Sequence, residues 1–224
     1  MSWWSFDEER VVWTIGFFQY FVIGCNSESS RSVNYMLSDQ LKQLTYHELA
    51  PTIHWRKVTD LYWIDEINYT IENNGYGDGT ADGAGRAAIV EAWAYFLGPT
   101  VANVAYGIQC SPVLYQDQAF LYTSTATESS FLRAMERFNP NLLGDEIRWI
   151  PKGIMHDLMD NTNVNELFPN PSDDQVAGYT ITQIFGALNN DVVDPIQYRN
   201  RLLQQNANNQ QPQVNTLFTR YGYS

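Results

Sequence analysis

The chain has 224 residues, of which 44% are hydrophobic and 14% aromatic, so it is apolar enough to bury a sizeable core. Its 25 acidic residues outnumber the 13 basic ones and give a formal net charge of −12. A surface of that sign repels phosphate backbones, which argues against a nucleic-acid partner. We therefore expect one globular domain over residues 1–224.

The N-terminal part, residues 1–37, contains an apolar run at residues 11–23 that predicts a strand or a buried helix. The run is too short to span a bilayer, so no transmembrane segment is expected. The acidic residues before it, Asp7 to Glu9, lack the net positive charge of a signal peptide. Cys25 and Cys110 form no CxxC pair, and the sequence leaves a disulfide between them open.

A helix is expected to start at Ser38-Asp39, where a good cap precedes an acid in the first turn. Leucines at helical spacing place His47 and Glu48 within this helix or at its end. Pro51 lacks the N–H that would bond the carbonyl of His47, and proline inside a helix costs about 3 kcal/mol. The helix is therefore predicted to end near Ala50 or to bend there.

Two further helices, with a loop between them, are predicted after Pro51. Residues 54–73 predict an amphipathic helix that stops at Asn73-Asn74-Gly75. Residues 75–85 are glycine-rich and predict a loop. Residues 84–97 predict a helix, ended by Gly98-Pro99, whose alanines allow another element to pack closely against it.

The remainder, residues 99–224, predicts mostly helices, with a strand as an alternative at residues 101–108. Thr180 and Asp194-Pro195 are predicted to cap two of these helices. Residues 206–212 form a polar linker. The predicted helices cover residues 128–138, 150–160, 181–188, 195–205 and 214–221.

The sequence His47-Glu48-Leu49-Ala50-Pro51 begins like the zinc-peptidase motif His-Glu-x-x-His. In that motif two histidines one helical turn apart bind one zinc ion, and the glutamate polarises the water on the zinc. Here His47 and Glu48 occupy the positions of the first ligand and the base. Pro51 stands where the second histidine would be.

Glu91 is the second candidate ligand, because it lies mid-helix among alanines, where a carboxylate needs a partner or a metal. It either pairs with a base such as Arg86, is exposed, or supplies a third ligand as glutamate does in His₂Glu zinc sites. His54 faces the same way as His47 in a straight helix, but roughly 10 Å farther along. A bend at Pro51 would bring it to the metal; otherwise His54 packs beside Trp55.

Residues 44–98 resemble a family of bacterial zinc-peptidase-like proteins of the gluzincin type, many of them surface lipoproteins. The shared features are His47-Glu48-Leu49-Ala50, the Tyr62-Trp63 pair, and a Glu91-Ala92-Trp93 helix ending in glycine. Parts of residues 149–223 are also similar. The resemblance implies a mainly α (α+β) gluzincin-like domain with a small sheet near the N-terminus, whose residues 38–98 carry the two motif helices.

The resemblance also implies a zinc ion held by His47 and Glu91, Glu48 as the base in peptide hydrolysis, and a peptide or protein substrate. It implies export to the cell surface. Because Pro51 departs from the pattern at the second ligand, we expect hydrolysis to be weak or absent. The alternative is a non-catalytic binding module on the same scaffold. His156 is either a transition-state proton donor or a helix-surface residue.

Overall fold

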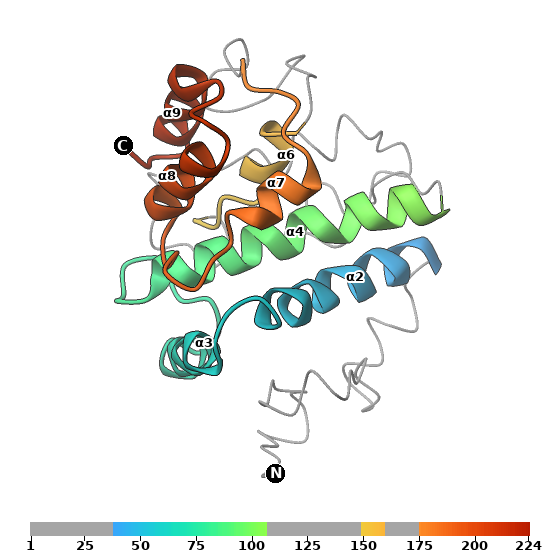
Figure 1. Cartoon of the computed structure of the whole chain (residues 1–224). Coiled ribbons are helices and arrows are strands. Elements are labelled where there is room, and N and C mark those ends of the chain that lie inside the picture. The colour runs from blue at the N-terminus through green and yellow to red at the C-terminus, as the bar shows by residue number, and fades with distance from the viewer. Residues whose placement is uncertain (1–37, 107–148, 160–174) are drawn as a thin grey trace.

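The computed structural model describes residues 38–106, 149–159 and 175–224, shown as ribbons in Figure 1. Helices, and no strand, make up the regular structure in these ranges, so the described part is mainly α, as predicted. The sheet predicted within residues 1–37 lies outside them. The helices are α2 (Ser38–Trp55), α3 (Asp60–Glu72), α4 (Ala84–Tyr106), α6 (Ile154–Asp157), α7 (Ile181–Gly186), α8 (Pro195–Gln205) and α9 (Gln211–Arg220).

The long helix α4 lies at the centre of the described part. Helix α2 runs beside it in the opposite direction, and α6, α7, α8 and α9 lie on its other side (Figure 1). Small side chains such as Ala87, Ala88 and Ala92 are almost completely buried in α4. They let neighbouring elements approach the helix closely, as the alanine-rich sequence predicted.

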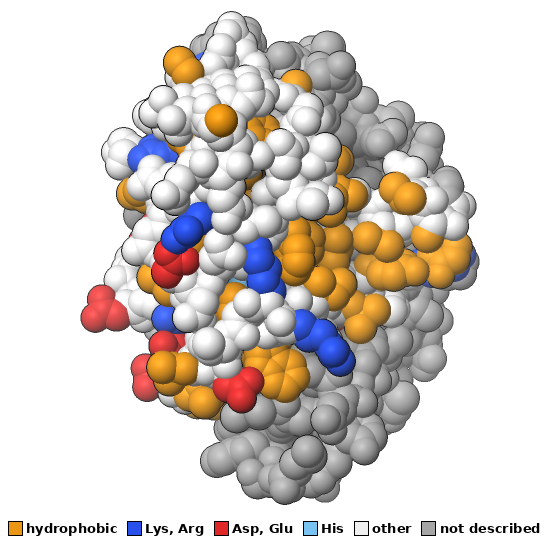
Figure 2. Space-filling view, viewed as in Figure 1, with side chains coloured by type: hydrophobic (Ala, Val, Ile, Leu, Met, Phe, Trp, Pro, Cys, Tyr) orange, Lys and Arg blue, Asp and Glu red, His pale blue; other side chains and the backbone are white. Residues whose placement is uncertain are grey.

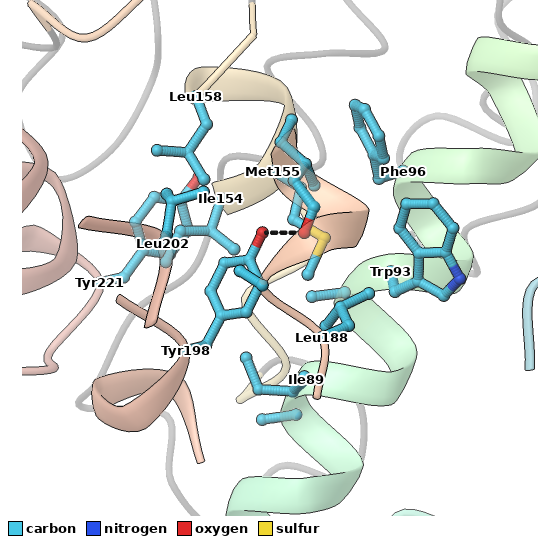
Figure 3. Packing of buried hydrophobic residues seen from close by; sticks show 14 of the residues in the cluster. Ile89, Trp93, Phe96, Ile154, Met155, Leu158, Leu188, Tyr198, Leu202 and Tyr221 are labelled. Atoms are coloured by element: carbon cyan, nitrogen blue, oxygen red, sulfur yellow. Dashed lines mark hydrogen bonds between the residues drawn. The ribbon is translucent and has the colours of Figure 1, made fainter. Parts of the chain in front are cut away.

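The main hydrophobic core fills the space between α4 and the C-terminal helices (Figure 3). Trp93 and Phe96 of α4, Met155 of α6 and Leu188 belong to this core, and all four side chains are buried (Figure 3). Tyr198 of α8 is also buried, and its hydroxyl donates to the Ile184 carbonyl at 3.1 Å. Burying each large apolar side chain contributes about 1.5–3 kcal/mol, so this core fixes α4 against the C-terminal helices.

Helix α2 continues past Pro51 to Trp55, so an end near Ala50 is wrong, whereas the alternative of a bend there stays a prediction. Both Ala50 and Pro51 are buried, and the Trp93 indole N–H donates to the Ala50 carbonyl at 3.1 Å. Packing against α4 therefore offsets the cost of the proline, which local propensity alone could not do.

Helix α4 likewise runs through Gly98-Pro99 to Tyr106 instead of ending there. The alternative of a strand is wrong for residues 101–106, and residues 107–108 lie outside the described ranges. Pro99 removes the N–H that would bond the Tyr95 carbonyl. The side chain of His156 hydrogen-bonds that carbonyl instead, which supplies a partner for the acceptor inside the helix.

Helix α3 begins at Asp60 and not at His54, because Thr59 caps it. The Thr59 hydroxyl accepts from the Tyr62 backbone N–H at 3.4 Å. The helix ends at Glu72, its C-cap is Asn73, where the stop was predicted, and Gly75 follows with φ of +116°. The glycine-rich loop thus starts with a residue that tolerates a left-handed backbone.

The C-terminal helices largely follow the predicted caps. Thr180 forms a capping box with Gln183 at the start of α7, and Asp194 caps α8, whose first residue is Pro195. Helix α6 is shorter than predicted, and α9 begins before the predicted residue 214. The helix predicted over 128–138 lies outside the described residues.

Some large hydrophobic side chains remain exposed on the described surface. On α3 these are Leu61, Ile64 and Ile71, which are 65%, 38% and 48% exposed. Figure 2 shows hydrophobic side chains gathered on the side of α2 and α4. Within the described ranges no helix combines the length and the apolar character needed to cross a membrane.

Candidate functional site

Helices α2 and α4 bring His47 and Glu91 together. The Nε2 atom of His47 lies 3.7 Å from Oε2 of Glu91, and the side chains are only 11% and 13% exposed. The imidazole also meets the Tyr95 ring edge-on, with 4.7 Å between centroids, and hydrogen-bonds the backbone of Ala94. Three contacts from α4 therefore hold the His47 ring.

Burial sets the charge state of this pair. Burial, with a smaller contribution from the positive charge of Lys152, lowers the pKa of His47 to about 4. Burial also raises the pKa of Glu91 to about 8, helped by the negative charges of Glu48 and Glu66. Although 3.7 Å would suit an ion pair, both groups are neutral near pH 7. We therefore describe the contact as a neutral imidazole facing a protonated carboxyl group.

Glu48, the predicted base, lies next to His47 on α2 and belongs to the same neighbourhood. Its charge raises the pKa of Glu91 and of Tyr76, so all three groups lie within electrostatic reach. Burial raises the pKa of Glu48 to about 7. Near neutral pH the two carboxyl groups thus carry less than two negative charges between them.

Two tyrosines complete what we call the His–Glu cluster, which consists of His47, Glu48, Tyr76, Glu91 and Tyr95. The Tyr76 hydroxyl hydrogen-bonds the Glu91 carboxyl group. Charge on Glu91 and burial together raise the pKa of Tyr76 well above its usual value. Tyr76 comes from the glycine-rich loop, where no motif marked it.

Contacts from two other segments hold the loop that carries Tyr76. The Tyr69 hydroxyl of α3 donates to the Tyr76 carbonyl at 2.7 Å. The Trp149 indole N–H donates to the Gly77 carbonyl at 3.0 Å.

The segment that contains Trp149 also contains Lys152, whose Nζ lies 4.8 Å from the centre of the Tyr95 ring. No local pattern in the sequence distinguishes Lys152 from other surface lysines.

His54 is placed away from the cluster's contacts. It is completely buried, and its ring meets the edges of Tyr62 and Trp63 on α3, with centroids 5.1 and 5.7 Å away. Burial lowers its pKa to about 3, with a smaller effect from Lys57. His54 thus packs among aromatic side chains, but these are Tyr62 and Trp63 of α3 and not Trp55, which was the predicted neighbour.

His156 is buried and not on a helix surface, so that expectation is wrong. Its ring packs edge-on against Phe96 at 5.0 Å and hydrogen-bonds the Tyr95 carbonyl. Burial lowers its pKa to about 4.

Arg86 was suggested as a partner of Glu91 on the same helix, but its contacts are with residues of α3. Its guanidinium lies 3.1 Å from Oδ2 of Asp65 and stacks over the Tyr62 ring. Glu66 of α3 is buried near Arg86, and burial raises its pKa to about 8 although the arginine charge lowers it. The Arg86 interactions therefore belong to the contact between α3 and α4.

No protein family matches the chain. Neither the curated proteins nor the solved structures contain a significant match. The resemblance to zinc peptidases therefore depends on the motif residues and stays a prediction.

The donor set can be compared with the needs of a zinc ion. Two ligands about 2.0–2.1 Å from one tetrahedral zinc ion lie roughly 3.3 Å apart, close to the separation of His47 and Glu91. A zinc site takes three or four protein ligands, however. Among residues 38–106, 149–159 and 175–224, no three His, Cys, Asp or Glu side chains form a group that could hold a metal. As described, these residues offer two ligands and do not fit zinc.

Proposed function

We propose that this protein is a zinc-peptidase-like domain in which metal-dependent peptide hydrolysis is weak or absent. The observation that carries the proposal is the pairing of His47 with Glu91 at 3.7 Å across α2 and α4. This is the juxtaposition that a peptidase of this type requires. Pro51, one turn after His47 in a continuous helix, offers no side chain that can bind a metal.

The chemistry of the cluster supports the same proposal. A metal-dependent hydrolase needs a carboxylate base and ligands that bind a cation strongly. Here burial favours the protonated forms of Glu48 and Glu91 near neutral pH. With Tyr76 and Tyr95 beside them, these groups form a neutral hydrogen-bonding cluster, which suits binding a polar group better than activating water.

Metal analysis of the purified chain tests the proposal. We expect much less than one zinc ion per chain, no chelator-sensitive cleavage of a fluorogenic peptide library, and the same result for His47→Ala. The melting temperature should not respond to zinc or to a chelator. Stoichiometric zinc that is lost on His47→Ala, with peptide cleavage lost on Glu48→Gln, would show an active enzyme and overturn the proposal.

A second candidate is a binding module that recognises an apolar peptide segment. The exposed side chains of Leu61, Ile64 and Ile71 favour it, because they recur at helical spacing on α3. Exposed apolar patches of this kind mark interaction sites. Peptides selected by display on the wild-type protein should lose binding to Leu61→Lys. Equal binding to both proteins would remove α3 as the binding surface.

A further inference from the structure

One side of α2 carries an apolar stripe beside the face that packs against α4. Tyr46, Leu49 and Ile53 follow one another at intervals of three and four residues, so they share one side of the helix. His47 and Ala50, which contact α4, lie on a different side. Ile53 is 43% exposed, and Tyr46 and Leu49 are half-buried. We call Tyr46, Leu49 and Ile53 the α2 stripe.

A positive charge lies at each end of the α2 stripe. Lys42 precedes Tyr46 by one turn, and its Nζ lies 4.8 Å from the centre of the Tyr106 ring of α4, which is 54% exposed. The Tyr46 and Tyr106 hydroxyls are 3.2 Å apart, so the stripe continues onto α4, where Figure 2 shows hydrophobic side chains gathered. The exposed Arg56 follows Ile53 at the other end. In a chain with a net charge of −12, such a surface suits a segment that is both apolar and acidic.

The chain itself contains a segment of this kind. Ten of the thirteen side chains in residues 11–23 are large and apolar, and in a helix they would occupy every side, so the run requires burial. Residues 7–10, directly before the run, contain three acids and one arginine. As a helix, which is one of the two alternatives given above, the run would be about 20 Å long. The distance along α2 from Lys42 to Arg56 is about the same, roughly 21 Å.

The connection between the run and α2 is long enough for the two to lie side by side. Residues 24–37, fourteen in all, separate the run from Ser38, the first residue of α2. They can span up to about 46–50 Å, and a segment tethered over such a distance is present at a high effective concentration. The shortest route reverses the chain between residue 23 and Ser38. The acidic residues 7–9 then come to lie at the Arg56 end of the stripe.

We propose that residues 11–23 dock on the α2 stripe, antiparallel to α2, with the acidic residues 7–9 beside Arg56. Burial of apolar surface drives the docking, and the charges at the two ends set its direction. The inference goes beyond the proposed function, because it concerns the outer side of α2 and not the His–Glu cluster.

Hydrogen exchange of the full chain, measured by mass spectrometry on peptides that cover residues 11–23, tests the docking. Ile53→Arg places a charge in the stripe, and we expect the exchange of this segment to become at least about tenfold faster. Leu61→Arg is the matched control, since Leu61 is 65% exposed on α3 and lies outside the stripe. It should change the exchange by less than about twofold. Circular dichroism checks that each variant is folded.

Charge reversal at the end of the stripe tests the direction of docking. Arg56→Glu should make the exchange of residues 11–23 about two- to fivefold faster, and adding Glu8→Lys and Glu9→Lys should restore the wild-type rate. Lys42→Glu, at the opposite end, should not be rescued by the same two lysines. If they rescue Lys42→Glu and not Arg56→Glu, the run lies parallel to α2 and the proposed direction is overturned.

Three further outcomes would overturn the docking itself. Equal exchange of residues 11–23 in the wild type and Ile53→Arg means that the run does not lie on the stripe. Faster exchange in Leu61→Arg alone places the run on α3 instead. Protection that rises with protein concentration means that the run belongs to a second copy of the chain. Should Ile53→Arg fail to fold, the exposed Arg56→Glu decides the question, and a lack of any effect overturns the proposal.

Discussion

The side chain of His156 hydrogen-bonds the carbonyl of Tyr95, the acceptor that Pro99 leaves without its helical donor. His156 is buried and packs against Phe96, so the bond is shielded from water. A proline in the middle of α4 is thereby accommodated by a residue from a different segment.

This relationship predicts a measurable coupling between the two residues. His156→Phe keeps a ring against Phe96 but leaves the Tyr95 carbonyl without this donor, so we expect a loss of about 1–3 kcal/mol in the free energy of unfolding. In a Pro99→Ala background the restored N–H satisfies the carbonyl, and the loss should shrink by about 1 kcal/mol. Urea denaturation of the four proteins checks this. Additive effects would mean that the two residues do not share the carbonyl.

The two helices with internal proline show what sequence could not predict. Local rules end α2 near Ala50 and α4 near Pro99, yet both helices continue. At Pro99 the group that makes this possible is His156, which donates to the Tyr95 carbonyl. At Pro51 it is the packing of Ala50 and Pro51 against α4, where Trp93 donates to the Ala50 carbonyl. Trp93 and His156 are both distant in sequence from the proline beside which they pack. By contrast, the caps at Thr180 and Asp194 depend on residues within one turn and were predictable.

The candidate site likewise contains residues that the sequence indicated and residues that it did not. The pairing of His47 with Glu91 follows what the resemblance to zinc peptidases implied, because both residues belong to the motifs that carry that resemblance. Tyr76 and Lys152 could not. Their positions depend on loop and segment contacts such as that between Trp149 and Gly77, which leave no local pattern.

Lys57 joins the end of α2 to the end of α7. Its ammonium donates to the carbonyls of Phe185 and, at 2.6 Å, Gly186, which are among the last acceptors of that helix. Lys57→Met keeps the apolar stem but removes both bonds, and we expect a loss of about 1–3 kcal/mol in unfolding free energy. The neighbouring and exposed Arg56→Met should change stability by less than about 0.5 kcal/mol. Similar melting temperatures for the two variants would contradict the role given to Lys57.

Gly85 permits a close approach between the first turn of α4 and the segment before α8. A Cβ atom there would lie 2.7 Å from Cβ of Asp194 and 2.9 Å from the Val193 carbonyl oxygen. Gly85→Ala should therefore destabilise the protein by about 1–3 kcal/mol.

A second glycine provides the control for this substitution. At Gly186 a Cβ atom would meet only the Oε1 end of the Gln205 side chain, at 3.3 Å, and that end can move. Gly186→Ala should therefore be neutral or stabilising by up to about 1 kcal/mol. The comparison is made by thermal unfolding, and equal stability of the two alanine variants would show that the close approach at Gly85 is not constraining.

The raised pKa of Glu66 should make the free energy of unfolding depend on pH. Burial raises its pKa in the folded protein to about 8 from an ordinary value of 4.5. The folded state therefore holds this proton more tightly than the unfolded state. The stability that Glu66 contributes is fully present below about pH 4.5 and is lost as the pH rises toward 8, with a slope of up to about 1.4 kcal/mol per pH unit.

Glu66→Gln removes this titration, so the free energy of unfolding should fall less steeply for the variant than for the wild type between pH 5 and 8. Buried histidines such as His156 have lowered pKa values and act in the opposite sense below about pH 6.5. They are present in both proteins, so their effect cancels in the difference. Glu72→Gln, an exposed change on the same helix, is the control. Urea denaturation at each pH measures the difference, and parallel curves for wild type and Glu66→Gln would mean that Glu66 is ionised in the folded protein throughout this range.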